Sequence, residues 1–187
     1  MLNYKSSINE TKNYSEINMT EFAPVIKINL RGKKRDFITK IGKSLSIIIP
    51  TEPNTSSSNE NLNILWLSPD EWMLYTNEKD HAFGNNYNLE EKLFSEISKV
   101  NLGSVTNVSD HWSIINIKGK NIYELLSSGC PFNFNKFKNT KGAVTQTILN
   151  HVDVIIHNKD INEINLFVRR SFSNHLWSWM NDSARFL

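Results

Sequence analysis

The sequence predicts an α+β protein in which antiparallel sheets are covered by helices. Short runs of alternating apolar residues come in pairs separated by turn residues, which is the pattern of β-hairpins. Single segments with apolar residues at helical spacing lie between these pairs. This interleaving favours helices packed on antiparallel sheets over a parallel α/β fold. No repeat of short period is visible that would indicate a solenoid.

The first half of the chain predicts a strand, a helix, a hairpin and a second helix. Residues 25–30 alternate as a strand does, and residues 35–43 have helical spacing that ends near Gly42. In residues 64–75, two apolar runs flank four turn residues, which predicts a hairpin. The second helix should begin at an Asn88 N-cap. Its buried stripe consists of Leu89, Leu93, Ile97 and Val100. We expect polar loops over residues 50–63 and 77–87.

The second half predicts further strands and two helices. Residues 104–108 and 112–118 are strand-like, and a short helix after Gly119 should end at Gly129. Residues 151–157 predict one strand of a hairpin. The second strand of this hairpin has Ile164, Leu166 and Val168 on one face. The final helix covers residues 173–186, and its apolar face consists of Leu176, Met180, Ala184 and Trp177.

The domain prediction separates a short N-terminal segment from the rest. Residues 1–20 are polar without a steady period, so we expect a flexible tail or an arm that orders on a partner. Residues 21–187 are expected to form a single domain, with two lobes at about 21–108 and 109–187.

Composition narrows the function classes. The 187 residues are 39% hydrophobic and 21% charged, as in globular proteins. A net charge of +2 does not indicate a nucleic-acid partner, and we interpret the basic run at 31–35 as a solvated turn, with an anion contact as the alternative. One cysteine excludes an internal disulfide and any zinc site with several cysteines. No apolar run reaches the roughly 20 residues that span a bilayer, and we expect a cytoplasmic protein.

The only cysteine lies in the stretch LSSGCPFNF. Gly129 stands where a helix end favours positive φ, and Pro131 prevents the helix from resuming. No Lys, Arg or His lies within five residues of Cys130, and the negative end of a helix dipole disfavours a thiolate. We therefore interpret Cys130 as a small apolar residue under the turn. A nucleophile served by a distant base is the alternative.

Two groups of residues near predicted strands contain side chains that could take part in chemistry. One strand face is expected to contain His151, Asp153 and His157. His157 would lie roughly 20 Å from His151 along the strand, so all three cannot bind one metal ion. We therefore expect this face of the sheet to be exposed to solvent. Asp110 and His111 could be an acid/base pair, although a turn fits better.

The Arg169-Arg170-Ser171 sequence precedes the final helix, where it could bind a phosphate or carboxylate. We favour pairing of Arg170 with a carboxylate or a partner chain, with Ser171 or Ser173 as a helix cap. No complete catalytic constellation is visible in the sequence.

Several ordered blocks over about residues 22–187 resemble the gamma subunit of heterotetrameric sarcosine oxidase. The hairpin ILWLSPDEWMLY at 64–75 resembles a signature of that family, as do the blocks at 105–135, 142–149 and 168–179. One departure is that Ala143 and Val144 stand where relatives often have a cysteine. The Gly129-Cys130-Pro131 sequence is common in the family, but it differs from the cysteine segment of a protein with the same fold, the folate-dependent iron–sulfur maintenance protein. The role of that protein's cysteine is therefore not expected of Cys130.

The resemblance implies the folate-binding fold of the glycine-cleavage T-protein. It also implies a non-catalytic accessory subunit, packed on the alpha chain beside the beta and delta chains. The family's complex oxidises sarcosine to glycine and forms hydrogen peroxide and 5,10-methylenetetrahydrofolate. Its FAD, FMN, NAD and zinc belong to other subunits, so no catalytic, cofactor-binding or metal residue is expected here.

A partner contact is expected from Trp72, Arg170, Trp177 and Trp179, because Arg and Trp are common interface anchors. The alternative function is a stand-alone protein that binds folate or transfers an aminomethyl group.

Overall fold

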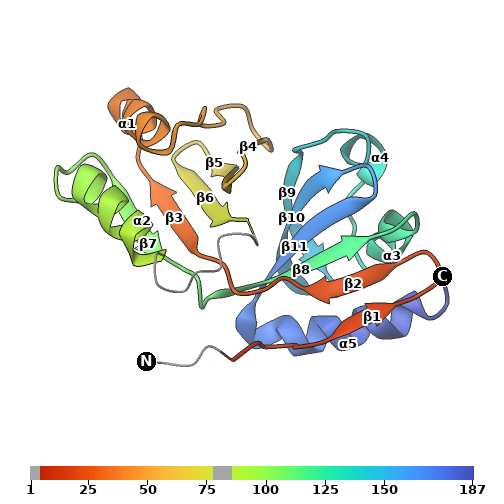
Figure 1. The fold of residues 1–187 in the computed structure, drawn as a ribbon. Helices are drawn as coiled ribbons and strands as arrows, with labels where there is room; N and C mark the ends of the chain where they lie inside the picture. Colours follow the sequence, from red (N-terminus) through yellow and green to blue (C-terminus); the bar gives the residue numbers. More distant parts are fainter. Residues whose placement is uncertain (1–4, 78–85) are drawn as a thin grey trace. The chain divides into compact units, whose positions relative to one another are not determined.

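The computed structural model describes residues 5–77 and 86–187, which form two compact units (Figure 1). One unit is Val25–Ser109, and the other joins the residues up to Pro24 to Asp110–Leu187. Each unit combines an antiparallel sheet with helices, so the predicted α+β class is confirmed. The N-terminal segment belongs to the same unit as the second half of the chain, an arrangement that a simple division near residue 108 did not anticipate.

The sheet of the Val25–Ser109 unit has five strands in the order β4-β5-β6-β3-β7. The predicted hairpin is confirmed: Ser68 stands opposite Glu71, with Pro69 and Asp70 as the turn. The polar loop expected over 50–63 contains the short edge strand β4. The strands are β3 (Lys27–Arg31), β4 (Ser56–Ser58), β5 (Leu62–Ser68), β6 (Glu71–Thr76) and β7 (Ser104–Asn107).

Two helical segments pack on this sheet. Helix α1 (Arg35–Leu45) buries Phe37, Ile41 and Leu45, as its spacing predicted. Helix α2 (Asn86–Leu93) continues into a π-helical turn, η2 (Phe94–Ser98). The predicted Asn88 cap is wrong because the helix already includes Asn86, and Val100 is 56% exposed because the helical turns end before it. Most of the loop predicted over 77–87 lies outside the described residues.

The other unit contains a six-stranded antiparallel sheet in the order β1-β2-β8-β11-β10-β9. The hairpin predicted after residue 151 is confirmed, with a turn at Ile161 and Asn162. One sheet face buries Val154, Ile156 and Leu166 in the main core cluster. The strands are β1 (Thr11–Asn13), β2 (Asn18–Glu21), β8 (Trp112–Lys118), β9 (Val144–Leu149), β10 (Val152–Asp160) and β11 (Glu163–Arg169).

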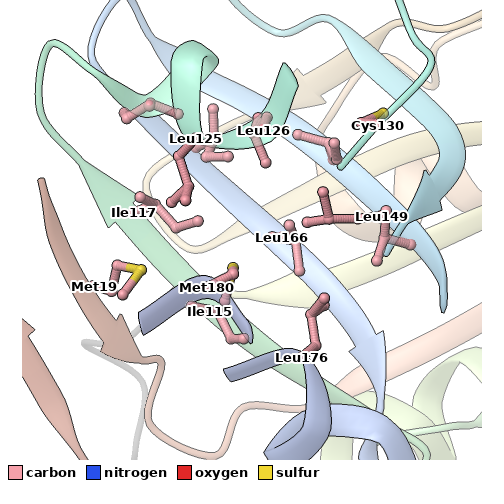
Figure 2. Close-up of a cluster of buried hydrophobic side chains, with 14 of the residues drawn as sticks. Met19, Ile115, Ile117, Leu125, Leu126, Cys130, Leu149, Leu166, Leu176 and Met180 are labelled. Atoms are coloured by element: carbon pink, nitrogen blue, oxygen red, sulfur yellow. The ribbon is translucent and has the colours of Figure 1, made fainter. Parts of the chain in front are cut away.

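Helices cover that core face. Helix α3 (Ile122–Ser127) is the predicted short helix, and α5 (Ser173–Ala184) buries the predicted apolar stripe, including Leu176 and Met180 (Figure 2). A four-residue helix, α4 (Phe134–Phe137), and a 3-10 turn, η3 (Arg170–Phe172), were not predicted. Phe172 occupies the N-cap of α5 without a side-chain hydrogen bond, so the predicted serine cap is wrong.

The N-terminal segment differs from the flexible tail expected for residues 1–20. Strand β2 pairs with β8, and Met19 is fully buried in the core. The Glu21 carboxylate accepts hydrogen bonds from Ser6, Ser7 and the amides of Ile8 and Asn9. Burial opposes the ionisation of Glu21, but these hydrogen bonds together hold its pKa below the ordinary value. The segment therefore orders on the chain's own sheet.

The prediction of positive φ at Gly129 is also wrong, since only Gly119 and Gly142 have positive φ among the described glycines. A Cβ atom on Gly129 would lie 2.5 Å from Cζ2 of the Trp179 ring. Glycine is required there by close packing. At Gly119, by contrast, φ is +134° and a Cβ would lie 1.9 Å from the Glu16 carbonyl oxygen, so both conformation and space require glycine.

Candidate functional site

Cys130 is part of the hydrophobic core. Its side chain is 8% exposed, at the edge of the cluster that contains Leu126 and Leu149 (Figure 2). The Sγ atom lies 3.5 Å from the Thr147 hydroxyl oxygen, a contact that spans the turn after α3 and strand β9. The interpretation as a small packed residue is confirmed, because the thiol fills space in an apolar cluster.

The structure separates His151, Asp153 and His157. The prediction that His151 shares the strand face is wrong, because His151 lies in the turn before β10 with a φ of +65°. His151 and Asp153 are exposed, but His157 is only 1% exposed, so the expectation of a solvent-exposed face is wrong at that residue. Burial, with a smaller contribution from the Lys159 charge, lowers the pKa of His157 to about 3. His157 is therefore neutral at physiological pH. Within residues 5–77 and 86–187, no cluster of three or more His, Cys, Asp or Glu side chains is placed to hold a metal ion.

Asp110 and His111 lie in the turn before β8, as predicted. The His111 carbonyl accepts a hydrogen bond from the Arg170 amide at 2.9 Å, and His111 Nε2 lies 3.0 Å from Arg169 Nη1. The Arg169 guanidinium also lies 5.7 Å from the centre of the Trp112 ring. The fold thus pairs His111 with arginines 58 and 59 residues away along the chain. Local sequence patterns contain no signal for that pairing.

Two of the four residues expected at a partner interface belong to the interior. Trp72 is 2% exposed, and its Nε1–H donates to the Pro50 carbonyl at 2.7 Å. Trp177 is 4% exposed, and its Nε1–H donates to Glu10 Oε2 at 3.2 Å. Because neither ring reaches the surface of the folded chain, their assignment as partner contacts is corrected.

Arg170 and Trp179 remain partly accessible. The Arg170 guanidinium donates to the Lys5 carbonyl, which ties the N-terminal segment to the end of β11. The Trp179 ring is half-buried over Gly129, next to the main core cluster. Both side chains therefore have structural contacts as well as exposed surface.

The sequence reasoning did not single out Phe94, an exposed aromatic on the second helical segment. Phe94 is 46% exposed, while Leu93 and Ile97 beside it are fully buried. An open hollow of about 500 Å³ is lined by Asn88, Glu91, Lys92, Phe94, Ser95 and Lys99. The sequence signal that could have indicated this surface is an aromatic residue off the apolar stripe of a helix.

No helix in the described parts of the chain combines the length and apolarity needed to cross a membrane.

Comparisons with known proteins identify the family and the fold. The family model described as "Sarcosine oxidase, gamma subunit family" matches residues 32–185. The structure is similar to heterotetrameric sarcosine oxidase from Corynebacterium sp. U-96 in complex with pyrrole 2-carboxylate, with a TM-score of 0.80 and 19% identity over 90% of this chain and 84% of that chain.

It is also similar to glycine cleavage system aminomethyltransferase T from Bartonella henselae, with a TM-score of 0.62 and 12% identity over 88% of this chain and 45% of that chain. No curated protein matches the sequence. The resemblance seen in the sequence and the T-protein-like fold are therefore both confirmed.

Proposed function

Because this chain belongs to the sarcosine oxidase gamma subunit family, we propose that it is a non-catalytic accessory subunit of a heterotetrameric sarcosine oxidase. The family match over residues 32–185 carries this proposal. The complex would convert sarcosine to glycine with formation of hydrogen peroxide and 5,10-methylenetetrahydrofolate. Its partners would be the alpha, beta and delta subunits, with alpha in the most direct contact. FAD, FMN, NAD and zinc would be held by those subunits.

The contacts of the reactive side chains support a structural role. Cys130 packs in the core, and His157 is buried in its neutral form. Arg169 stacks on Trp112 and contacts His111, and Arg170 holds the N-terminal segment. These groups stabilise the chain's own fold, which is what we expect of a subunit that contributes surface to an assembly.

A second candidate is a stand-alone protein that binds folate or transfers an aminomethyl group. The observation that favours it is the likeness to an aminomethyltransferase, whose TM-score is 0.62. At 12% identity that likeness concerns the fold. This candidate predicts saturable binding of tetrahydrofolate to the isolated chain.

Co-expression with the alpha, beta and delta chains tests the proposal. We expect this chain to elute with the flavin-absorbing peak in size-exclusion chromatography, and its omission to reduce the amount or the sarcosine oxidation activity of that peak. Elution of this chain alone and colourless, beside a complete oxidase, would contradict the proposal. Titration of the isolated chain with tetrahydrofolate would then test the second candidate.

Arg170 and Trp179 stay proposed as contacts of this subunit with the alpha chain. In the same co-expression, Arg170→Ala and Trp179→Ala should weaken recovery of the complex, since loss of a true anchor costs at least about 2 kcal/mol of binding. Trp177→Ala is the comparison for lost stability, because Trp177 is a core residue. Full assembly by the Arg170 and Trp179 variants would remove both from the interface.

A further inference from the structure

We propose that the solvent-facing side of α1 and of the α2–η2 segment docks an acidic surface of a partner protein, with Phe94 as the apolar contact. This inference rests on the proposed function, because it names the kind of surface through which the subunit joins its complex. The basic helix face is defined by Lys34, Arg35, Lys40, Lys43, Lys92, Phe94 and Lys99.

The two helical segments form one continuous surface. The Lys92 ammonium group donates to the Ser44 carbonyl at 2.7 Å, and the Ser44 hydroxyl donates to the Glu96 carboxylate. Their inner sides share one core cluster, in which Phe37 of α1 and Ile97 of η2 are buried. These contacts hold the last turn of α1 against the second helical segment.

The α1 part of this face is strongly positive. Residues 33–46 contain five basic side chains and one acidic side chain, Asp36, whereas the net charge of the whole chain is only +2. Lys33 lies 3.8 Å from Asp70. Within the described parts of the chain, the N-cap Lys34 and the three cations of α1 (Arg35, Lys40 and Lys43) form no ion pair. The second segment, residues 86–99, contains Lys92 and Lys99 against Glu90, Glu91 and Glu96, so the positive charge of the face comes from α1 and its N-cap.

The position of these cations also opposes the local preference of a helix. Lys33, Lys34 and Arg35 stand at the N-terminal end of α1, where the helix dipole is positive and acidic residues are favoured. Lys34 occupies the N-cap, and no side chain caps the helix there. Asp70 lies 3.8 Å from Lys33 and Asp36 lies in the first turn, but Lys34 and Arg35 form no ion pair among the described residues. A locally unfavourable arrangement of this kind is expected where a surface serves a function.

The hollow beside Phe94 provides the apolar part of the surface. Its volume is about 500 Å³, and Glu91, Lys92 and Lys99 are among the residues that line it. An exposed aromatic residue surrounded by longer polar side chains has the composition of an interface centre with its rim. The η2 turn that carries Phe94 is π-helical, a conformation that is frequent at functional sites.

These features indicate the chemistry of the occupant. Cations that lack partners favour carboxylates on the opposing surface, and Phe94 requires an apolar side chain opposite it. A partner protein with an apolar side chain among acidic residues satisfies both requirements. A polyanion such as a nucleic acid would use the cations but would offer no aliphatic group for the hollow.

The test measures association with the flavin-containing partner complex. Lys40→Glu/Lys43→Glu should lower the association rate constant about tenfold at low salt and weaken its salt dependence, because steering charges are reversed. Phe94→Ala should raise the dissociation rate constant about tenfold. Lys136→Glu/Lys138→Glu is the matched control, since these lysines are exposed at α4, and it should change either rate constant less than about twofold.

Thermal unfolding midpoints equal to wild type would show that the variants are folded, as their exposed positions predict. If the wild-type chain joins the complex and Lys40→Glu/Lys43→Glu joins equally fast, this inference is overturned while the proposed function stands. If the wild-type chain never joins the flavin-containing peak, both are overturned. The inference would also be overturned if, at about 0.15 M salt, the wild-type chain bound duplex DNA or phosphatidylserine vesicles more tightly than it bound the partner complex.

Discussion

At the scale of single residues, the buried His157 should make the free energy of unfolding depend on pH. It lies on β10 between Val144 of β9 and Asn165 of β11, and it is 1% exposed. Burial is the main cause of its lowered pKa of about 3, against an ordinary value of 6.5. The folded chain therefore holds a neutral imidazole that the unfolded chain would protonate below neutral pH.

The free energy of unfolding should consequently decrease as the pH falls from about 6.5 toward 3. In that window the unfolded chain binds a proton that the folded chain does not, so the slope is at most about 1.4 kcal/mol per pH unit. Urea unfolding should show a loss of about 2 kcal/mol between pH 7 and pH 5. His157→Gln should remove most of this dependence, whereas His175→Gln on the exposed side of α5 should retain it. Equal pH profiles for both variants would contradict the assignment.

At the scale of elements, Gly129, just after the end of α3, contacts both α5 and the β9–β10 turn. The Gly129 carbonyl accepts a hydrogen bond from the Asn150 amide at 2.9 Å. The Trp179 ring occupies the space where a Gly129 side chain would be. This contact explains why the glycine is needed although its φ is not positive.

Gly129→Ala should lower the free energy of unfolding by about 1–3 kcal/mol, because the added methyl group overlaps the Trp179 ring. In a Trp179→Ala background the same substitution should cost much less, since the ring is absent. A double-mutant cycle by urea denaturation measures the difference. Purely additive effects of the two substitutions would show that the ring is not the cause.

At the scale of the whole molecule, the N-terminal segment completes the six-stranded sheet. Its strand β2 places Asn18 opposite Lys118, and the Tyr14 hydroxyl donates to Asn181 on α5. Met19 and Ile17 contribute buried apolar surface to the core cluster. The segment is therefore part of the folding unit.

Met19→Ala should lower the free energy of unfolding by about 2–5 kcal/mol, as expected for a fully buried methionine. Lys12→Ala, on the exposed strand β1, is the control and should change it by less than about 0.5 kcal/mol. Chemical denaturation of the full chain measures both variants. If Met19→Ala were as mild as Lys12→Ala, the flexible-tail interpretation would be correct.

The sequence by itself determined the elements whose pattern is local. The hairpin at residues 64–75, the hairpin of β10 and β11 and the apolar stripe of α5 follow from periods of two and of about 3.6 residues. The ordered blocks of residues also identified the family that the comparison confirms. Such signals are readable because neighbouring residues in an element share one backbone conformation.

Tertiary structure decided which surfaces these elements share. The pairing of β2 with β8, the contact of Trp177 with Glu10 and that of Arg169 with His111 join residues far apart in the chain. A tryptophan residue can lie in a core or at an interface, so residue type alone did not exclude Trp72 and Trp177 as partner contacts, although Trp177 lies on the predicted apolar face of α5. The physical reason is that periodicity defines the faces of an element, whereas the packing of distant segments determines which faces are covered.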